Sequence, residues 1–126
     1  MTTPAPTEVR HDLDPLTKRF PEIGTPTFAA WATWNSATGG FPGPTTYWID
    51  AVVTLEPATT EALVGRYQPT AQDKVPHVQQ LLQAEVPAGP FVTGAALDKA
   101  LSTSGWRSSA YLDRQNNRLV ISAIDD

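Results

Sequence analysis

The clearest pattern in the chain is an alternation of hydrophobic and polar positions with a period of two, which runs through 28–35 and 46–55. Successive side chains of a strand point to opposite faces of a sheet, so both segments are predicted to be β-strands. Each face of the first strand carries one tryptophan, Trp34 or Trp31, and we therefore expect this strand to be partly covered on both sides. The expected core face of the second strand consists of Tyr47, Ile49, Ala51, Val53 and Leu55.

The segment 36–45 between these strands is rich in glycine and proline and is predicted to be a loop. Its glycines superficially resemble a phosphate-binding loop. That motif requires a lysine followed by serine or threonine, and a helix that begins directly after the loop. Neither is present, because the segment joins two strands, so turn geometry explains the glycines.

Capping residues and apolar positions three or four apart predict several helices. A short first helix begins at Asp12 or Asp14 and ends before Pro21. Three more helices are expected later in the chain: from Thr59 or Thr60 to Tyr67, over 75–86, and from Thr93 as N-cap to Gly105.

Two further strands, 106–113 and 118–125, are predicted at the end of the chain, around a turn near Gln115–Asn117. Asparagine tolerates the left-handed conformation that tight turns require, and Asp113 can accept hydrogen bonds within the turn. The order of elements is therefore β-β-α-α-α-β-β. The predicted fold class is α+β: an antiparallel four-stranded sheet of two hairpins, with helices packed on one face.

The length of 126 residues fits a single domain. Residues 1–12 are polar, contain prolines and lack periodicity, so we expect a flexible N-terminal arm and one α+β domain over 13–126. The arm has no positive start followed by an apolar run, and no stretch approaches the roughly 18 apolar residues of a membrane span. We therefore expect a cytoplasmic protein that does not bind membranes.

The formal net charge is −4, and the first 63 residues carry all of the excess negative charge. No basic stripe is present that could neutralise phosphates, so nucleic acid is not an expected partner. A basic or neutral partner fits this charge better. The absence of cysteine excludes disulfides, thiol catalysis and thiolate zinc sites.

Residues that could support catalysis are few. His11 lies in the expected flexible arm, and His77 has no carboxylate three or four residues further on, so we expect no metal and no cofactor. No serine lies in a hydrolase motif. The carboxylates that could meet in space are Asp50, Glu56, Asp98 and Asp113. Local structure explains Asp50 least well, and the sequence overall favours a protein without enzymatic activity.

Aromatic residues give the stronger signal, because there are too many large rings for one small core to hide completely. In one interpretation Trp34, Tyr47 and Trp106 are core, and Phe41 anchors the loop. In the other, Trp31 and Trp48 lie opposite the core sets and form an exposed patch or pocket. The predicted binding residues are Trp31, Trp48, Phe41, Asp50 and Arg107.

Our first hypothesis is a small non-enzymatic binding protein, such as an inhibitor, an immunity-type protein or an assembly accessory. It would bind another protein, or a second copy of itself, through the sheet surface and the 35–46 loop. The alternative is a pocket for a small apolar or aromatic ligand, lined by tryptophans with Asp50 or Arg107 as polar groups, with or without weak catalysis. A third hypothesis is a structural component that forms oligomers through an edge strand.

Overall fold

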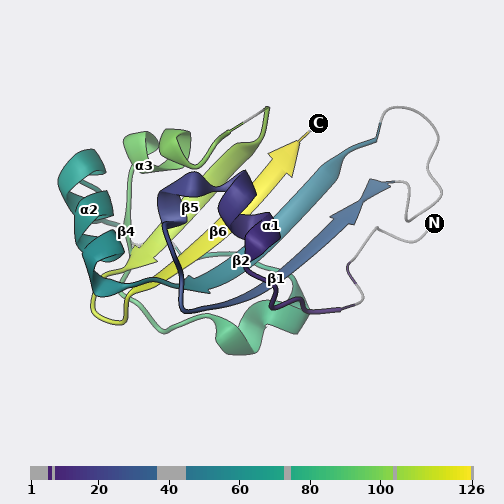
Figure 1. The fold of residues 1–126 in the computed structure, drawn as a ribbon, viewed down its shortest axis with the longest axis horizontal. Helices are drawn as coiled ribbons and strands as arrows, with labels where there is room; N and C mark the ends of the chain where they lie inside the picture. The colour runs from purple at the N-terminus through teal and green to yellow at the C-terminus, as the bar shows by residue number, and fades with distance from the viewer. Residues whose placement is uncertain (1–5, 7, 37–44, 73–74, 104, 126) are drawn as a thin grey trace.

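The computed structural model describes residues 6, 8–36, 45–72, 75–103 and 105–125. Its centre is an antiparallel sheet of six strands in the order β1-β2-β6-β5-β4-β3 (Figure 1). The four long strands are β1 (Phe28–Asn35), β2 (Tyr47–Thr54), β5 (Arg107–Asp113) and β6 (Arg118–Asp125). The predicted α+β class, with an antiparallel sheet and a few helices, is confirmed.

The prediction of four strands is wrong, because two short strands extend the sheet beyond β5. These are β3 (Thr70–Ala71) and β4 (Val92–Thr93). Val92 pairs with Leu112 of β5, and Thr70 pairs with Thr93. A strand of two residues is too short to show a period of two, so no alternation predicts it. Thr93 consequently lies in β4, and the N-cap of the following helix is Gly94.

The two predicted hairpins are present and are joined through their second strands. β1 pairs with β2, β5 pairs with β6, and β2 pairs with β6 along its whole length. In the β5–β6 turn, Asp113 accepts hydrogen bonds from the backbone N–H and the side-chain amide of Asn116. Asn117 has a φ of 55°. The turn therefore uses the residues that its sequence predicts.

The main core lies between one face of the sheet and the three α-helices. These are α1 (Asp14–Arg19), α2 (Pro57–Tyr67) and α3 (Ala95–Ala100), with the 3₁₀ turn η1 (Pro21–Ile23) after α1. Prolines near the start of α1 and α2 fit the first helical turn, where no N–H partner is needed. The helical side of this core consists of Leu16, Phe20, Ile23, Leu63, Leu97 and Leu101.

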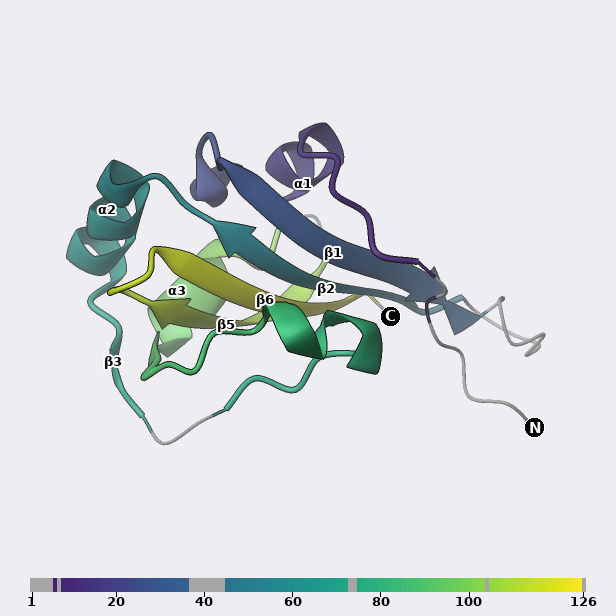
Figure 2. The same cartoon turned by 90° about the horizontal axis from the view of Figure 1, so that it is seen from below.

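The opposite face of the sheet is covered as well, as expected for β1 but not for the sheet as a whole. The segment expected to be a helix over 75–86 contains a 3₁₀ helix, η3 (Gln80–Glu85). Figure 2 shows α1 above the sheet and η3 below it. This second core consists of Ala30, Ala32, Val52, Val78, Leu82, Phe91 and Val120. The expectation that helices pack on only one face is therefore wrong, because the apolar side chains of the second face require their own cover.

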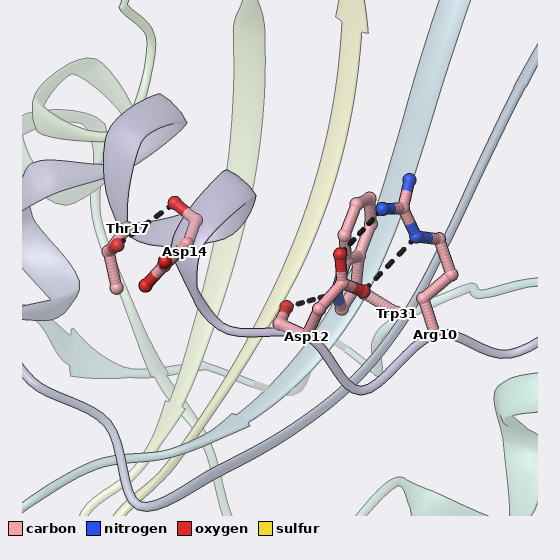
Figure 3. Close-up of polar contacts among 5 residues, drawn as sticks. All are labelled: Arg10, Asp12, Asp14, Thr17 and Trp31. Carbon is pink, nitrogen blue, oxygen red and sulfur yellow. Dashed lines mark hydrogen bonds and ion pairs between the residues drawn. The ribbon is translucent and has the colours of Figure 1, made fainter.

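Residues 10–12, which precede α1, are held against the edge of β1 by contacts with Trp31 (Figure 3). The backbone of Arg10 forms two hydrogen bonds with that of Trp31, at 2.7 and 2.9 Å. The Arg10 guanidinium lies 4.2 Å from the centroid of the Trp31 ring, and the indole N–H donates to the Asp12 carbonyl at 2.9 Å. Hydrogen bonds from Arg10 to the Asp12 carboxylate lower the pKa of Asp12. Trp31 is thereby buried.

Tyr47 departs from its expected place in the core, since 45% of its surface is exposed. It is the first residue of β2 and pairs with Asn35 and Asp125 at the end of the sheet. The residues that follow on the same face, Ile49, Ala51 and Val53, are buried as predicted. In the described part of the chain, no helix is long and apolar enough to cross a bilayer.

Replacing Ile121 by alanine is expected to lower the free energy of unfolding by about 2–5 kcal/mol, because the smaller side chain leaves a cavity in the main core. Ile121 is completely buried in the central strand β6. Urea unfolding followed by tryptophan fluorescence measures the effect. Ser109→Ala, at an exposed position on the adjacent strand, is the control and should change stability by less than about 0.5 kcal/mol. Equal effects of the two substitutions would contradict this description of the core.

Candidate functional site

Three of the predicted binding residues lie on the second face of the sheet. Trp48 and Asp50 are two residues apart on β2, and Arg107 lies on β5. Trp48 pairs with Ile124, which in turn pairs with Arg107, so Trp48 and Arg107 lie on the same face. Asp50 is two residues after Trp48 and therefore shares this face. Arg107 is exposed at the far side of this row.

The other two predicted binding residues do not join this group. Trp31 is only 3% exposed and lies in the main core, on the opposite face of the sheet. The expected patch that combines Trp31 with Trp48 therefore does not exist, because alternation places the two rings on opposite faces. Phe41 lies outside the described residues.

Trp34 is the tryptophan that accompanies Trp48. The two residues are direct partners in the β1–β2 pair, with their rings stacked at a centroid distance of 5.8 Å and an interplanar angle of 14°. Trp34 is buried as expected, whereas Trp48 is only partly buried. The core position of Trp34 agrees with one of the two interpretations of the sequence, whereas its pairing with Trp48 was not predicted.

These two rings form one wall of a hollow of about 420 Å³, which we call the tryptophan pocket. The sheet contributes Asp50 and Ser122, and the segment before η3 contributes the opposite wall. The lining residues are Trp34, Trp48, Asp50, His77, Val78, Gln79 and Ser122. Segments that are distant in the sequence thus converge on Asp50.

Asp50 is 95% buried at this site, with 5% of its surface exposed. Its Oδ2 accepts a hydrogen bond of 2.8 Å from the backbone N–H of Gln79, and Ser122 on β6 is its partner across the strands. Burial of the carboxyl group raises the pKa of Asp50 above its ordinary value of 3.8, although the hydrogen bonds from Gln79 and Ser122 act in the opposite direction. Local spacing alone could not reveal this environment.

The Asp50 carboxylate has no cationic partner in the described part of the chain. The ion pairs found there join Arg10 to Asp12 and Arg66 to Glu22, both remote from the pocket. A buried charge in a protein is normally paired, because moving it out of water is unfavourable. The tryptophan pocket therefore contains a buried carboxyl group whose hydrogen-bond partners, Gln79 and Ser122, are neutral.

Two of the other candidate carboxylates, Asp98 and Asp113, accept hydrogen bonds within the fold, and the third, that of Glu56, accepts none among the described residues. Asp98 Oδ1 accepts a hydrogen bond from the Ala110 N–H, which links α3 to β5. Asp113 is fully buried and closes the β5–β6 turn. Glu56 precedes α2 and is exposed. None of them lines the tryptophan pocket.

The pocket brings one histidine near Asp50, because His77 also lines it. Among the described residues no hydrogen bond joins His77 to Asp50. His11 lies elsewhere, with its Nδ1 at 2.9 Å from the Ala29 carbonyl. The described ranges contain no group of three or more histidine and acidic side chains that could hold a metal ion. The pocket therefore places one carboxyl group and one imidazole beside two aromatic rings.

Comparison of this chain with models of known protein families, with curated proteins and with solved structures finds no match. A functional proposal must therefore come from the chemistry of the site itself.

The buried carboxyl group of Asp50 predicts a defined pH dependence of stability. The pKa of Asp50 in the folded protein lies above its ordinary value, so folding favours the protonated form. The free energy of unfolding of the wild type, relative to that of Asp50→Asn, should therefore rise as the pH falls from neutral through the folded pKa, and should level off below about 3.8. Urea unfolding of both proteins over this range measures the difference, and a constant difference would contradict the predicted shift.

Proposed function

We propose that this protein is a non-enzymatic binding protein whose tryptophan pocket receives the cationic group of a lysine or arginine side chain from a partner protein. The observation that carries the proposal is the Asp50 carboxylate, which is buried beside two tryptophans with no cation among its described neighbours. A bound ammonium or guanidinium group would supply the missing charge. Such pairing is the usual condition under which a carboxylate remains ionised when buried.

The aromatic wall suits the same ligand. Trp48 is partly exposed and stacks on Trp34, so its π face is held in one orientation before any ligand arrives. A cation over a tryptophan ring gains about 0.5–2 kcal/mol, with the larger values at sites shielded from water. The apolar part of a long basic side chain can also pack against Val78, which belongs to the opposite wall.

The charge of the whole chain supports a basic partner. The net charge is −4, which attracts positively charged proteins and increases their rate of encounter. The described ends of the segment predicted as a binding loop, Asn35 and Thr46, lie next to Trp34 and Tyr47 in the sequence. The pocket and the predicted binding surface are therefore close along the chain.

Binding without catalysis is the simpler interpretation of this geometry. General acid–base catalysis needs groups that can exchange a proton with a substrate and are themselves oriented by hydrogen bonds. Asp50 is oriented by hydrogen bonds from the Gln79 N–H and the Ser122 side chain, but among the described residues no hydrogen bond joins it to His77 or to a second carboxyl group. The pocket contains one carboxyl group, so the paired acids of a glycosidase are not formed there.

A second candidate function is the binding of a free small cation in the same pocket. The volume of about 420 Å³ favours it, because pockets of about 300–1,000 Å³ commonly bind small molecules. This candidate requires the same two tryptophans and the same carboxylate. It differs from the first in that no surrounding protein surface contributes to affinity.

Asp50→Asn should weaken the binding of basic peptides at least about tenfold, equivalent to about 1.4 kcal/mol, while the protein remains folded. The amide oxygen can still accept the Gln79 N–H, but the negative charge is lost. Trp48→Ala should weaken binding by a similar or larger factor. Peptides that contain lysine or arginine, and the same peptides with glutamine in its place, are compared by fluorescence titration of the tryptophans.

Asp125→Asn is the matched control for these variants, since it removes the same charge from β6 outside the pocket. It should leave the affinity within about twofold of the wild type. Equal binding of the basic and glutamine peptides, or equal loss in Asp125→Asn and Asp50→Asn, would refute the proposal. If tetramethylammonium or methylguanidinium binds as tightly as the peptides, the second candidate is correct.

The affinity for basic peptides is expected to fall as the pH falls. Protonation of Asp50 removes the negative charge at a pKa above 3.8, whereas lysine and arginine ligands stay positive throughout this range. His77 also lines the pocket, so the test replaces it with glutamine, which leaves Asp50 as the pocket's titratable side chain. Titration calorimetry on the His77→Gln variant separates the two, because the decrease that persists in this variant belongs to Asp50. Affinity that is independent of pH in His77→Gln would contradict the assigned role of Asp50.

A further inference from the structure

A second hollow, of about 640 Å³, lies at the other end of the sheet and shares no lining residue with the tryptophan pocket. It is bounded by α2, by the short strands β3 and β4, and by the β5–β6 turn, which lie together at one end of the molecule in Figure 1. Its apolar wall is formed by Val64 of α2 and by the consecutive residues Phe91 and Val92. We call it the α2 pocket.

Gly65 of α2 faces this hollow without a structural need for glycine. A Cβ atom added at Gly65 would meet nothing within 4 Å, and the residue does not have a positive φ. Glycine is the poorest helix former after proline, so an alanine here would suit the fold better. The bare backbone at Gly65 therefore leaves room for a molecule that approaches the helix closely.

Thr60, one turn earlier in the same helix, also lines the α2 pocket. Only 4% of its surface is exposed, and its Oγ1 has no hydrogen-bond partner in the described structure. Buried hydroxyl groups are nearly always hydrogen-bonded. The Thr60 hydroxyl therefore has a hydrogen bond left to make at the wall of this hollow, which a bound ligand could supply.

Two opposite charges stand at the rim of the α2 pocket. Glu61 comes from α2, and Arg114 comes from the β5–β6 turn. Both side chains are exposed, and within the described part of the chain neither takes part in an ion pair. A ligand that carries one positive and one negative charge, with an apolar body between or beside them, would complement this arrangement.

We propose that the α2 pocket binds a small zwitterion: a free amino acid or short peptide with apolar side chains. Its carboxylate would pair with Arg114 and its ammonium group with Glu61, while the side chains pack on Val64 and Phe91. Close approach at Gly65 brings the ligand to the helix backbone and within reach of Thr60. This proposal does not depend on the function of the tryptophan pocket.

The test is a titration of the ¹⁵N-labelled full-length protein with leucylleucine, followed through its amide NMR signals. We expect the largest shifts at Thr60, Gly65 and Arg114. N-acetyl-leucylleucine lacks the ammonium group and leucylleucine amide lacks the carboxylate, so each should bind at least fivefold more weakly. Glu61→Gln should weaken leucylleucine but not its N-acetyl form, and Arg114→Gln should weaken leucylleucine but not the amide.

The Gly65→Ala variant separates loss of binding from loss of structure, because it should bind more weakly without being less stable. The thermal midpoint should stay the same or rise by a few degrees, because alanine favours the helix and the added methyl group meets no protein atom. Affinity for leucylleucine should nevertheless fall at least tenfold. Glu56→Gln, immediately before α2 but outside the pocket, is the matched control for Glu61→Gln and should leave affinity unchanged.

The proposal is overturned if millimolar leucylleucine shifts no signal around the α2 pocket. It is also overturned if the acetylated and amidated forms bind as tightly as the zwitterion, or if Gly65→Ala binds as tightly as the wild type. Shifts confined to Trp48 and Asp50 would show that the dipeptide uses the tryptophan pocket instead. That result would leave the proposed function standing while refuting the second site.

Discussion

The pairing of β2 with β6 along eight residues is the interaction on which the rest of the structure depends. It joins two hairpins that are far apart in the sequence, and its register decides which side chains share a face. In this register Ala51 and Ile121 face the helices of the main core, while Val52 and Val120 face η3. A slip of one residue in either strand would turn each of its side chains to the other face of the sheet. Packing of the α-helices on one face and of η3 on the other therefore stabilises the same register.

The parts of the fold that could be predicted are those with a signal inside their own sequence. The segments of β1 and β2 carry a two-residue pattern, β5 and β6 flank a turn marked by Asp113 and Asn117, and α1 and α2 begin near a proline that favours the first helical turn. β3 and β4 could not be predicted, because the pairing of Thr70 with Thr93 depends on tertiary contacts. The spacing of Val78 and Leu82 indicates a helical segment, but only packing against the second face of the sheet decides that it is the 3₁₀ helix η3.

The candidate site could likewise be predicted only where its residues carry a signal in their own strand. Alternation correctly separates Trp31 from Trp34, but both faces of β1 are apolar, so the sequence does not say which ring enters the main core. Trp34 and Trp48 lie equally far from Phe41, so a symmetric hairpin would have paired them, as the structure does. The contacts of Asp50 with Gln79 and Ser122 come from distant segments and carry no sequence signal. Asp50 could be identified as unusual, but its burial could not.

The two hollows have one property in common: each contains a residue that the fold alone does not favour. The anchoring role of Asp50, which is to accept the Gln79 N–H, could be filled by asparagine without burying a charge. Gly65 could be replaced by alanine with no steric conflict and a more stable helix. Departures from local preference are expected where a residue serves something outside the folded chain. At Asp50 the departure is a charge, and at Gly65 it is a missing side chain, so the two hollows would select different ligands: one by electrostatics, the other by close approach to a helix.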